Sequence, residues 1–153
     1  MELDKIAIRK MHVEDLDEVL LIIEASSSLS PWSKNMFIEE ILNPLAYCFI
    51  FKNEKAPTDQ IVGFICFRNI GDESELLNIA VHPQHRQIGI GNKLMQFYLH
   101  FCRQVGMKTF HLEVNTSNPS AIHLYRLLSY EPVGLRKKFY DGKSDALIMI
   151  KRD

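Results

Sequence analysis

The feature that most limits how this chain can fold is a turn that carries two glycines and joins an apolar segment to an amphipathic one. Residues 75–81 are mostly apolar and predict a strand, while residues 91–105 place apolar side chains at helical spacing. At Gly89 and Gly91 the missing Cβ lets backbone N–H groups approach a ligand closely. With a helix N-terminus behind them, such N–H groups form a site for phosphate or pyrophosphate. The segment therefore predicts an α/β fold with an anion-binding turn.

The rest of the chain divides into short segments with strand-like or helix-like patterns. Helical spacing and capping residues predict further helices at 13–25, from Ser33 to Pro44, and from Asn118 to about 128. Apolar runs bounded by turn residues predict the other strands at 6–10, 46–51, 61–68, 109–114, 133–140 and 146–150. The predicted order is β-α-α-β-β-β-α-β-α-β-β. We expect one mixed α/β (α+β) domain over residues 1–153, with about seven strands flanked by four helices. Its central strand–helix–strand unit is the expected parallel pairing.

The glycine turn matches neither of two common nucleotide-binding motifs. No Gly-Lys-Ser/Thr follows it, so it is not a P-loop, and Leu94 replaces the third glycine of the dinucleotide fingerprint. Glu113 does lie about 20 residues further on, where an acid that binds a ribose would be expected. A dinucleotide- or coenzyme-binding module without catalytic activity therefore remains an alternative. Against it, such domains normally begin with this unit, and here five predicted elements precede it.

The charge of the chain is balanced overall and uneven along its length. The net charge of −1 lacks the basic excess that is typical of nucleic-acid binders. Residues 1–75 carry 7 Lys or Arg and 14 Asp or Glu, whereas residues 76–153 carry 11 and 5. These halves are either ordinary solvated faces, or a basic half that binds an anionic ligand and an acidic half that binds a cationic one.

The cysteines and the N-terminus indicate the compartment. Cys48, Cys66 and Cys102 lie in apolar runs at long spacings, which suits small buried side chains better than disulfides or a zinc site. The first residues do not resemble a signal peptide. No apolar run approaches the roughly 20 residues that a membrane span needs. We expect a cytoplasmic protein that contacts neither membrane nor nucleic acid.

Two segments of the chain resemble the cofactor motifs of the GNAT superfamily of acetyl-coenzyme A-dependent N-acetyltransferases. Residues 86–91, Arg-Gln-Ile-Gly-Ile-Gly, follow the pattern Gln/Arg-x-x-Gly-x-Gly/Ala, and residues 112–125 follow Leu-Glu-Val-x-x-x-Asn-x-x-Ala-x-x-Leu-Tyr. Within the superfamily, Pro31-Trp32-Ser33, the strand 77–81 and the run from Leu112 look most like the ribosomal-protein-alanine N-acetyltransferase branch. The chain departs from the pattern at Ile88, where relatives often carry Arg, and at Ser129, where the usual Leu-Gly-Phe has its Gly.

The resemblance implies a cofactor and its binding residues. Acetyl-coenzyme A would be the acetyl donor, and no metal would be needed. The residues implied to contact it are Ile79, Ala80, Val81, Arg86, Gln87, Ile88, Gly89, Ile90, Gly91, Asn92 and Asn118.

The resemblance also implies a general base, Glu113, and a general acid, Tyr125. An α-amine is partly ammonium near neutral pH and must lose a proton before it attacks a thioester. The departing thiolate must gain a proton, which a tyrosine can supply. On base rates alone, an isolated Glu such as Glu113 is more often a surface carboxylate on an alternating strand, and a Tyr such as Tyr125 is often packed under the sheet.

The acceptor side is expected to include Trp32, with Tyr140 opposite it. His82 and His85 lie three residues apart, but no third ligand at zinc-like spacing accompanies them. The resemblance predicts acetylation of the N-terminal α-amine of a protein, such as the N-terminal alanine of a ribosomal protein, and the acidic first half would suit a basic substrate. The alternatives are an acetyltransferase for a small amine and the non-catalytic module described above.

Overall fold

The computed structural model describes residues 6–25, 32–54, 60–86, 88–140 and 144–153, and leaves out the side chains of 138–140. The elements are β1 (Ile6–Lys10), η2 (Val13–Asp15), α1 (Leu16–Glu24), α2 (Lys34–Leu42), β2 (Ala46–Asn53), β3 (Ile61–Ile70), β4 (Glu73–Val81), η3 (Pro83–His85), α3 (Ile90–Gln104), β5 (Thr109–Asn115), α4 (Pro119–Leu127), β6 (Glu131–Tyr140) and β7 (Ser144–Arg152). The predicted order of strands and α-helices is confirmed. The predicted first helix begins later than expected, because residues 13–15 form a short 3-10 turn. No helix in the described ranges is long and apolar enough to cross a membrane.

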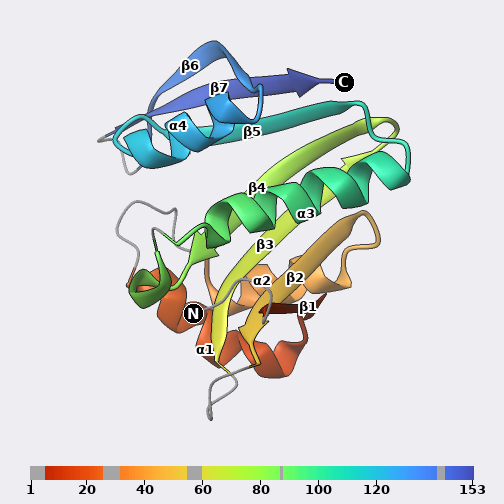
Figure 1. The fold of residues 1–153 in the computed structure, drawn as a ribbon, viewed down its shortest axis with the longest axis vertical. Coiled ribbons are helices and arrows are strands. Elements are labelled where there is room, and N and C mark those ends of the chain that lie inside the picture. Colours follow the sequence, from red (N-terminus) through yellow and green to blue (C-terminus); the bar gives the residue numbers. More distant parts are fainter. Residues whose placement is uncertain (1–5, 26–31, 55–59, 87, 141–143) are drawn as a thin grey trace.

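The strands form one sheet in the order β1-β2-β3-β4-β5-β7-β6 (Figure 1). All neighbouring strands are antiparallel except β4 and β5, which are parallel and are connected through α3. The parallel pairing predicted for the central strand–helix–strand unit is therefore confirmed. The turn predicted at Asp141 and Gly142 lies outside the described residues.

The parallel pairing of β4 and β5 is short. The register runs from Glu73↔Thr109 to Glu75↔His111, although β4 continues to Val81 and β5 to Asn115. Figure 1 shows the two strands close together at the right and diverging toward the left, where α4 and the start of α3 lie. The second half of each strand therefore borders a gap within the sheet.

Two apolar clusters cover the two faces of the sheet. The larger cluster packs α3 and Tyr125 of α4 against side chains from β2 to β5 and β7. The smaller one packs α1 and α2 against β2, β3 and Ala80 of β4. Among the described residues, this smaller cluster includes none from β5, β6 or β7, so α1 and α2 leave the second face of the C-terminal strands uncovered. The three cysteines are buried and free, as the sequence predicts.

Two helices begin with the caps that the sequence predicts. The Ser33 hydroxyl accepts the N–H of Met36, 3.2 Å away, at the start of α2. The Asn118 carboxamide oxygen accepts the N–H of Ala121, also at 3.2 Å, and proline follows at the first position of α4. Each cap satisfies a backbone donor that the helix itself leaves free, so both loops enter their helices in a defined way.

Helix α4 ends in a Schellman motif whose left-handed residue is not glycine. The N–H of Tyr130 bonds to the carbonyl of Tyr125, and the N–H of Ser129 bonds to that of Arg126, both at 3.0 Å. The φ angle of Ser129 is +72°. The rings of Tyr125 and Tyr130 lie 5.8 Å apart and supply the apolar contact of the motif. The serine in place of the usual glycine of Leu-Gly-Phe therefore leaves the turn unchanged. It does place the Cβ of Ser129 on a left-handed backbone, where a Cβ is strained.

Relieving this strain should stabilise the protein. A left-handed conformation costs a residue with a Cβ about 1–2 kcal/mol, and the extra unfolded-state entropy of glycine offsets about 0.5–1 kcal/mol of the gain. We expect Ser129→Gly to raise the free energy of unfolding by about 0.5–1 kcal/mol, measured by urea denaturation. Ser129→Ala keeps the Cβ and should give no such gain. An equal effect of both variants would contradict the strain argument.

Candidate active site

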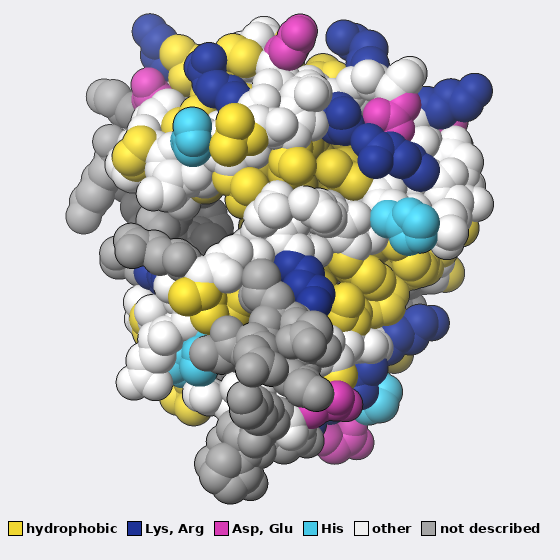
Figure 2. Space-filling view, viewed as in Figure 1, with side chains coloured by type: hydrophobic (Ala, Val, Ile, Leu, Met, Phe, Trp, Pro, Cys, Tyr) yellow, Lys and Arg dark blue, Asp and Glu magenta, His cyan; other side chains and the backbone are white. Residues whose placement is uncertain are grey.

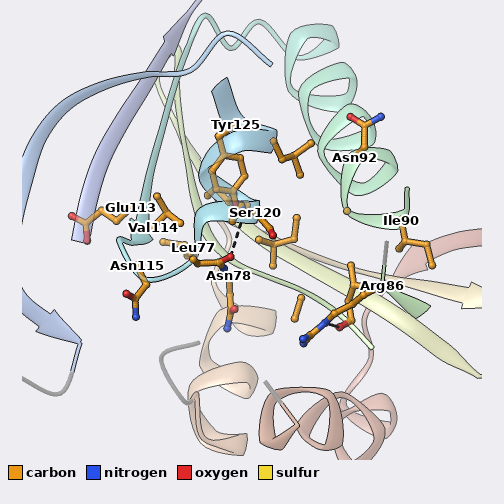
Figure 3. Close-up of a pocket in the computed structure, with 18 of the residues that line it drawn as sticks. Leu77, Asn78, Arg86, Ile90, Asn92, Glu113, Val114, Asn115, Ser120 and Tyr125 are labelled. Atoms are coloured by element: carbon orange, nitrogen blue, oxygen red, sulfur yellow. Dashed lines mark hydrogen bonds between the residues drawn. The ribbon is translucent and has the colours of Figure 1, made fainter. Parts of the chain in front are cut away.

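A cavity of about 600 Å³ occupies the gap between β4 and β5. Its walls are residues 76–81 of β4, the turn before α3 and the start of that helix, and residues 113–115 of β5. Asn118, one side of α4 as far as Tyr125, and Trp32 complete the wall. Figure 3 shows these side chains converging from separate elements on one space. The divergence of two parallel strands thus creates this hollow.

The cavity collects most of the side chains that the sequence singled out. Those that line it are Trp32, Ile79, Ala80, Val81, Arg86, Gly89, Ile90, Gly91, Asn92, Glu113, Asn118 and Tyr125. Ile88 is not part of the wall and is 42% exposed. Gln87 and the Tyr140 side chain lie outside the described residues.

The start of α3 presents backbone donors to this cavity. Gly89 is the N-cap residue, with a φ of +92° and no side-chain cap. The first intrahelical bond is donated by Lys93 to the carbonyl of Gly89, so the N–H groups of residues 90–92 precede the helical ladder. Free N–H groups and the positive end of the helix dipole favour an anion. The anion-binding turn that the sequence predicts therefore has suitable local geometry.

Gly91 has a different role from Gly89. A Cβ added at Gly91 would lie 3.7 Å from Leu124 Cδ2 and 4.0 Å from Val81 Cγ2, which is ordinary contact distance. Its φ is not positive, so the fold itself does not require glycine there. Gly89 is required for the turn, whereas Gly91 leaves room beside two cavity residues.

Arg86 and the two histidines organise the turn. The Arg86 Nε donates to the carbonyl of Val81, 3.2 Å away, and thereby ties the turn to the end of β4. His82 Nδ1 accepts the N–H of Gln84, and the rings of His82 and His85 lie 5.3 Å apart. Burial, followed by the nearby His82, lowers the pKa of His85. No group of three potential metal ligands occurs among the residues that the structure describes.

Glu113 is held by an ion pair that the sequence did not indicate. One carboxylate oxygen lies 2.7 Å from Nη2 of Arg136 on β6. Glu113 alternates with Leu112 and Val114, which belong to the cluster under α3, so its side chain faces the opposite side of the sheet. In Figure 3 its carboxylate points away from the ring of Tyr125. The candidate base thus lies on the sheet face that carries α1 and α2.

Tyr125 approaches the cavity from the other face. It is 5% exposed and belongs to the cluster under α3. Its ring packs against Tyr130 at the end of the same helix. The candidate acid and the candidate base are therefore separated by the sheet, and the gap between β4 and β5 is the passage that joins them.

Trp32 closes the cavity on the α1 and α2 side. Its ring packs edge-on to Phe37 at 5.1 Å, and Phe37 packs edge-on to Phe64 at 5.6 Å. This chain of aromatic contacts anchors Trp32 to the second apolar cluster. Trp32 is therefore partly core and partly cavity wall.

Several cavity residues were not singled out by sequence reasoning. The polar ones are Asn78, Asn115 and Ser120. Asn78 did carry a signal, because it is a lone carboxamide in an otherwise apolar stretch of strand. Asn115 follows a strand at a chain reversal, where its Oδ1 accepts from the N–H and hydroxyl of Ser117.

A second hollow of about 470 Å³ adjoins the first and shares Glu113 with it. Its charged side chains are Arg68, Glu73, Glu75, His111, Glu113 and Arg136. Arg68 is paired with Glu40 of α2 and Arg136 with Glu113. Glu73 in turn lies 2.9 Å from His111 Nε2. We call this second hollow the acidic groove, because its three glutamates outnumber its two arginines. On the face shown in Figure 2, Lys and Arg gather over the upper part of the molecule, where the C-terminal strands and α4 lie.

Comparison with known proteins identifies the class. Residues 13–130 match the model of the Acetyltransferase (GNAT) family. The chain belongs to this family of acetyltransferases, as the motifs at 86–91 and 112–125 predict.

Two similar bacterial proteins have names that describe the same activity. A Bacillus subtilis (strain 168) protein is 35% identical over 147 residues, which cover 95% of this chain and 94% of that protein. Its name describes it provisionally as a ribosomal protein bS18-alanine N-acetyltransferase. The enzyme of that name from Escherichia coli (strain K12) is 31% identical over 130 residues, covering 83% of this chain and 84% of the enzyme. The crystal structure of the ribosomal-protein-S18-alanine N-acetyltransferase from Escherichia coli matches with a TM-score of 0.84 at 27% identity, over 96% of this chain and 93% of that one.

Proposed function

We propose that this chain is an acetyl-coenzyme A-dependent N-acetyltransferase that modifies the N-terminal α-amine of a protein, and that the N-terminal alanine of ribosomal protein bS18 is its acceptor. The observation that carries the proposal is similarity over nearly the full length of both chains to a relative described with that activity. The cavity between β4 and β5 supports it, because it joins an anion-binding helix end to a carboxylate. Residues 1–153 would act as one catalytic domain in the cytoplasm, without metal, membrane or nucleic acid.

The wall of the cavity fits the proposed donor. The backbone donors of residues 90–92 would hold the pyrophosphate, and Arg86 would add positive charge beside them. Gly91 leaves space next to Val81 and Leu124, so the chain can approach the ligand there. Residues 79–81 border the unpaired side of β4 and would bind the pantetheine arm through backbone groups. Asn118 would bind near the thiol end, although its carboxamide oxygen already caps α4.

Acetyl-coenzyme A supplies an activated acetyl group when it is bound. Glu113 would accept the proton of the acceptor amine, directly or through a water molecule. A backbone N–H from residues 79–81 would stabilise the negative charge that develops on the acetyl oxygen. Tyr125 would donate a proton to the departing thiolate from the opposite face of the sheet.

The acceptor would enter from the face that carries α1 and α2. Trp32 forms one wall of the cavity there, and Tyr140 is proposed as the facing wall. The acidic groove begins at Glu113 and continues past Glu75 and Glu73, so a polypeptide whose N-terminus lies at Glu113 would have its following residues beside carboxylates. This charge favours a basic acceptor.

Two alternatives make different predictions. An acetyltransferase for a small amine would need no groove beyond Glu113. A non-catalytic coenzyme-binding module would bind the coenzyme without releasing free thiol. Release of coenzyme A in the presence of an acceptor therefore excludes the module, and the position of the acetyl group separates the two enzymes.

The donor site can be tested with a charge at Gly91. A carboxylate in the first turn favours the helix, and the Cβ has room, so Gly91→Glu should keep the parental melting temperature. The same carboxylate would repel an anionic diphosphate. We expect the Kd for acetyl-coenzyme A to rise roughly 10- to 100-fold by calorimetry. Gly91→Gln has the same length without the charge, so it reports only the filled space, and its Kd should rise less than that of the Glu variant. Parental binding by both variants would place the pyrophosphate elsewhere.

The acceptor class can be tested with defined peptides. A peptide that begins with free Ala should be acetylated on its α-amine, because Glu113 and the acidic groove would orient a chain terminus. Blocking that amine should abolish the reaction even when lysines are present, as assigned by tandem mass spectrometry. Acetylation of lysine side chains, or turnover with polyamines alone, would defeat the proposed acceptor while leaving the family assignment intact.

The same assay tests the acidic groove. Peptides that carry Arg after the first alanine should have a higher kcat/KM than matched peptides that carry Ser. The preference should shrink in the double variant Glu73→Gln/Glu75→Gln, which keeps side-chain size and removes both charges. A preference that persists unchanged would show that the groove does not contact the acceptor.

The proton transfers can be separated by two variants. Glu113→Gln should lower turnover by roughly 10²–10⁴-fold, because it keeps size and removes the base. Activity should recover partly as pH rises, since more acceptor amine is then deprotonated. Tyr125→Phe should slow departure of the thiolate, and its defect should shrink with a thioester whose leaving thiol is more acidic. Near-parental turnover of Glu113→Gln across neutral pH would show that another group is the base.

A further inference from the structure

Asn78 contains a buried hydrogen-bond donor without a partner. Its side chain is 7% exposed, and its Nδ2 atom has no hydrogen-bond partner among the described residues. Buried polar groups in folded proteins are nearly always paired, and an exception needs an explanation such as a ligand. Asn78 lines the cavity between β4 and β5. The residue that carries the orphan donor therefore belongs to the wall of the proposed active site.

A β-bulge determines which way Asn78 faces. In the ladder between β3 and β4, Phe67 pairs with Leu76 and Cys66 pairs with Asn78, which leaves Leu77 as the extra residue. Without that extra residue, the alternation that places Leu76 under α3 would also turn Asn78 toward α3. With it, Asn78 shares a face with its partner Cys66, which packs in the cluster of α1 and α2. Bulges commonly re-aim a side chain beside an active site.

This orientation places Asn78 on the same sheet face as Glu113. The two side chains come from β4 and β5, the strands that diverge, and both line the cavity. Figure 3 shows the carboxamide of Asn78 extending toward the helices on that face, whereas Tyr125 lies with α4. A donor and a carboxylate thus flank the acceptor's side of the opening.

We propose that Asn78 is an acceptor-binding residue that selects α-amines. Its Nδ2 donates a hydrogen bond to the carbonyl oxygen of the acceptor's first residue and thereby directs the amine toward Glu113. In an N-terminal residue the amine and this carbonyl are attached to the same Cα, so one donor fixes the amine relative to the base. The amine of a lysine side chain or a polyamine is carried on methylene groups and has no such carbonyl. A site built around this hydrogen bond disfavours acceptors that lack it. This inference rests on the proposed function and adds how the enzyme distinguishes α-amines from other amines.

The burial of Asn78 makes the hydrogen bond effective. Its Nδ2 is shielded from bulk water, so an acceptor carbonyl would compete with little solvent, and a hydrogen bond is stronger in a low dielectric. The free protein leaves this donor unsatisfied, and binding of the acceptor supplies the missing partner. Replacing Asn78 with an apolar residue of similar size should therefore not destabilise the folded chain.

The test compares two acceptors with and without the first carbonyl, each assayed with both the parent and the variant enzyme. One is a peptide that begins with free Ala; the other is the same peptide with its first carbonyl reduced to methylene. The parent enzyme should prefer the intact peptide. Asn78→Leu should lower kcat/KM for the intact peptide roughly 10- to 100-fold, and should leave the reduced peptide and the KM for acetyl-coenzyme A unchanged. Asn78→Asp keeps the size, removes the donor, and should show the same selective loss.

Asn69 provides a matched control. Its Nδ2 is also buried without a partner among the described residues, but Asn69 lines neither hollow. Asn69→Leu should leave the ratio of the two acceptors unchanged. Equal losses on both acceptors in Asn78→Leu, or a drop in its melting temperature that accounts for the lost activity, overturns this inference alone. Failure of the parent to acetylate the intact peptide overturns the proposed function and this inference with it.

Discussion

The early end of hydrogen bonding between β4 and β5 is the constraint on which the rest of the site depends. The two strands pair only as far as Glu75 and His111, and beyond that point the unpaired edges need other partners because buried backbone groups are rarely left unsatisfied. Each strand is held on its outer side, β4 by β3 and β5 by β7, so the gap is fixed rather than collapsed. A ligand with an extended polar arm can complete such an edge in the way that a strand would. The same divergence positions the N-terminus of α3, which begins where β4 has ended.

The sheet also divides the proposed chemistry between its two faces. Tyr125 belongs to the cluster beneath α3, while Glu113, Asn78 and Trp32 belong to the opposite side. An acceptor on one face and a donor that reaches the gap from the other would meet only between the strands. This arrangement separates the proposed base, Glu113 of β5, from the proposed acid, Tyr125 of α4, although α4 directly follows β5 in the chain.

Local patterns predicted the elements well, and long-range pairing accounts for what they missed. Helical spacing placed the third helix at 91–105, within one residue of its observed ends, and Asn118 followed by proline predicted the start of α4. The bulge at Leu77 could not be predicted, because it depends on how β3 and β4 align. In the sequence alone, Asn78 is a polar interruption of an apolar strand, and nothing marks it as a cavity residue. The partner of Glu113 was missed for the same reason, since Arg136 reaches it only through the pairing of three strands.

The C-terminal hairpin contributes to the site although the match to the family model ends at residue 130. β7 pairs with β5 over the whole length of β5 and places Ile148 opposite Glu113. β6 then pairs with β7 and brings Arg136 to the Glu113 carboxylate. On the other face, the turn that leads into β6 holds Tyr130 against Tyr125. Both proposed proton-transfer groups are thus fixed by residues that follow α4, while the residues proposed to hold acetyl-coenzyme A, apart from Asn118, precede β5. A change in the hairpin would therefore move the proposed base relative to the acceptor and leave most of the proposed donor site in place.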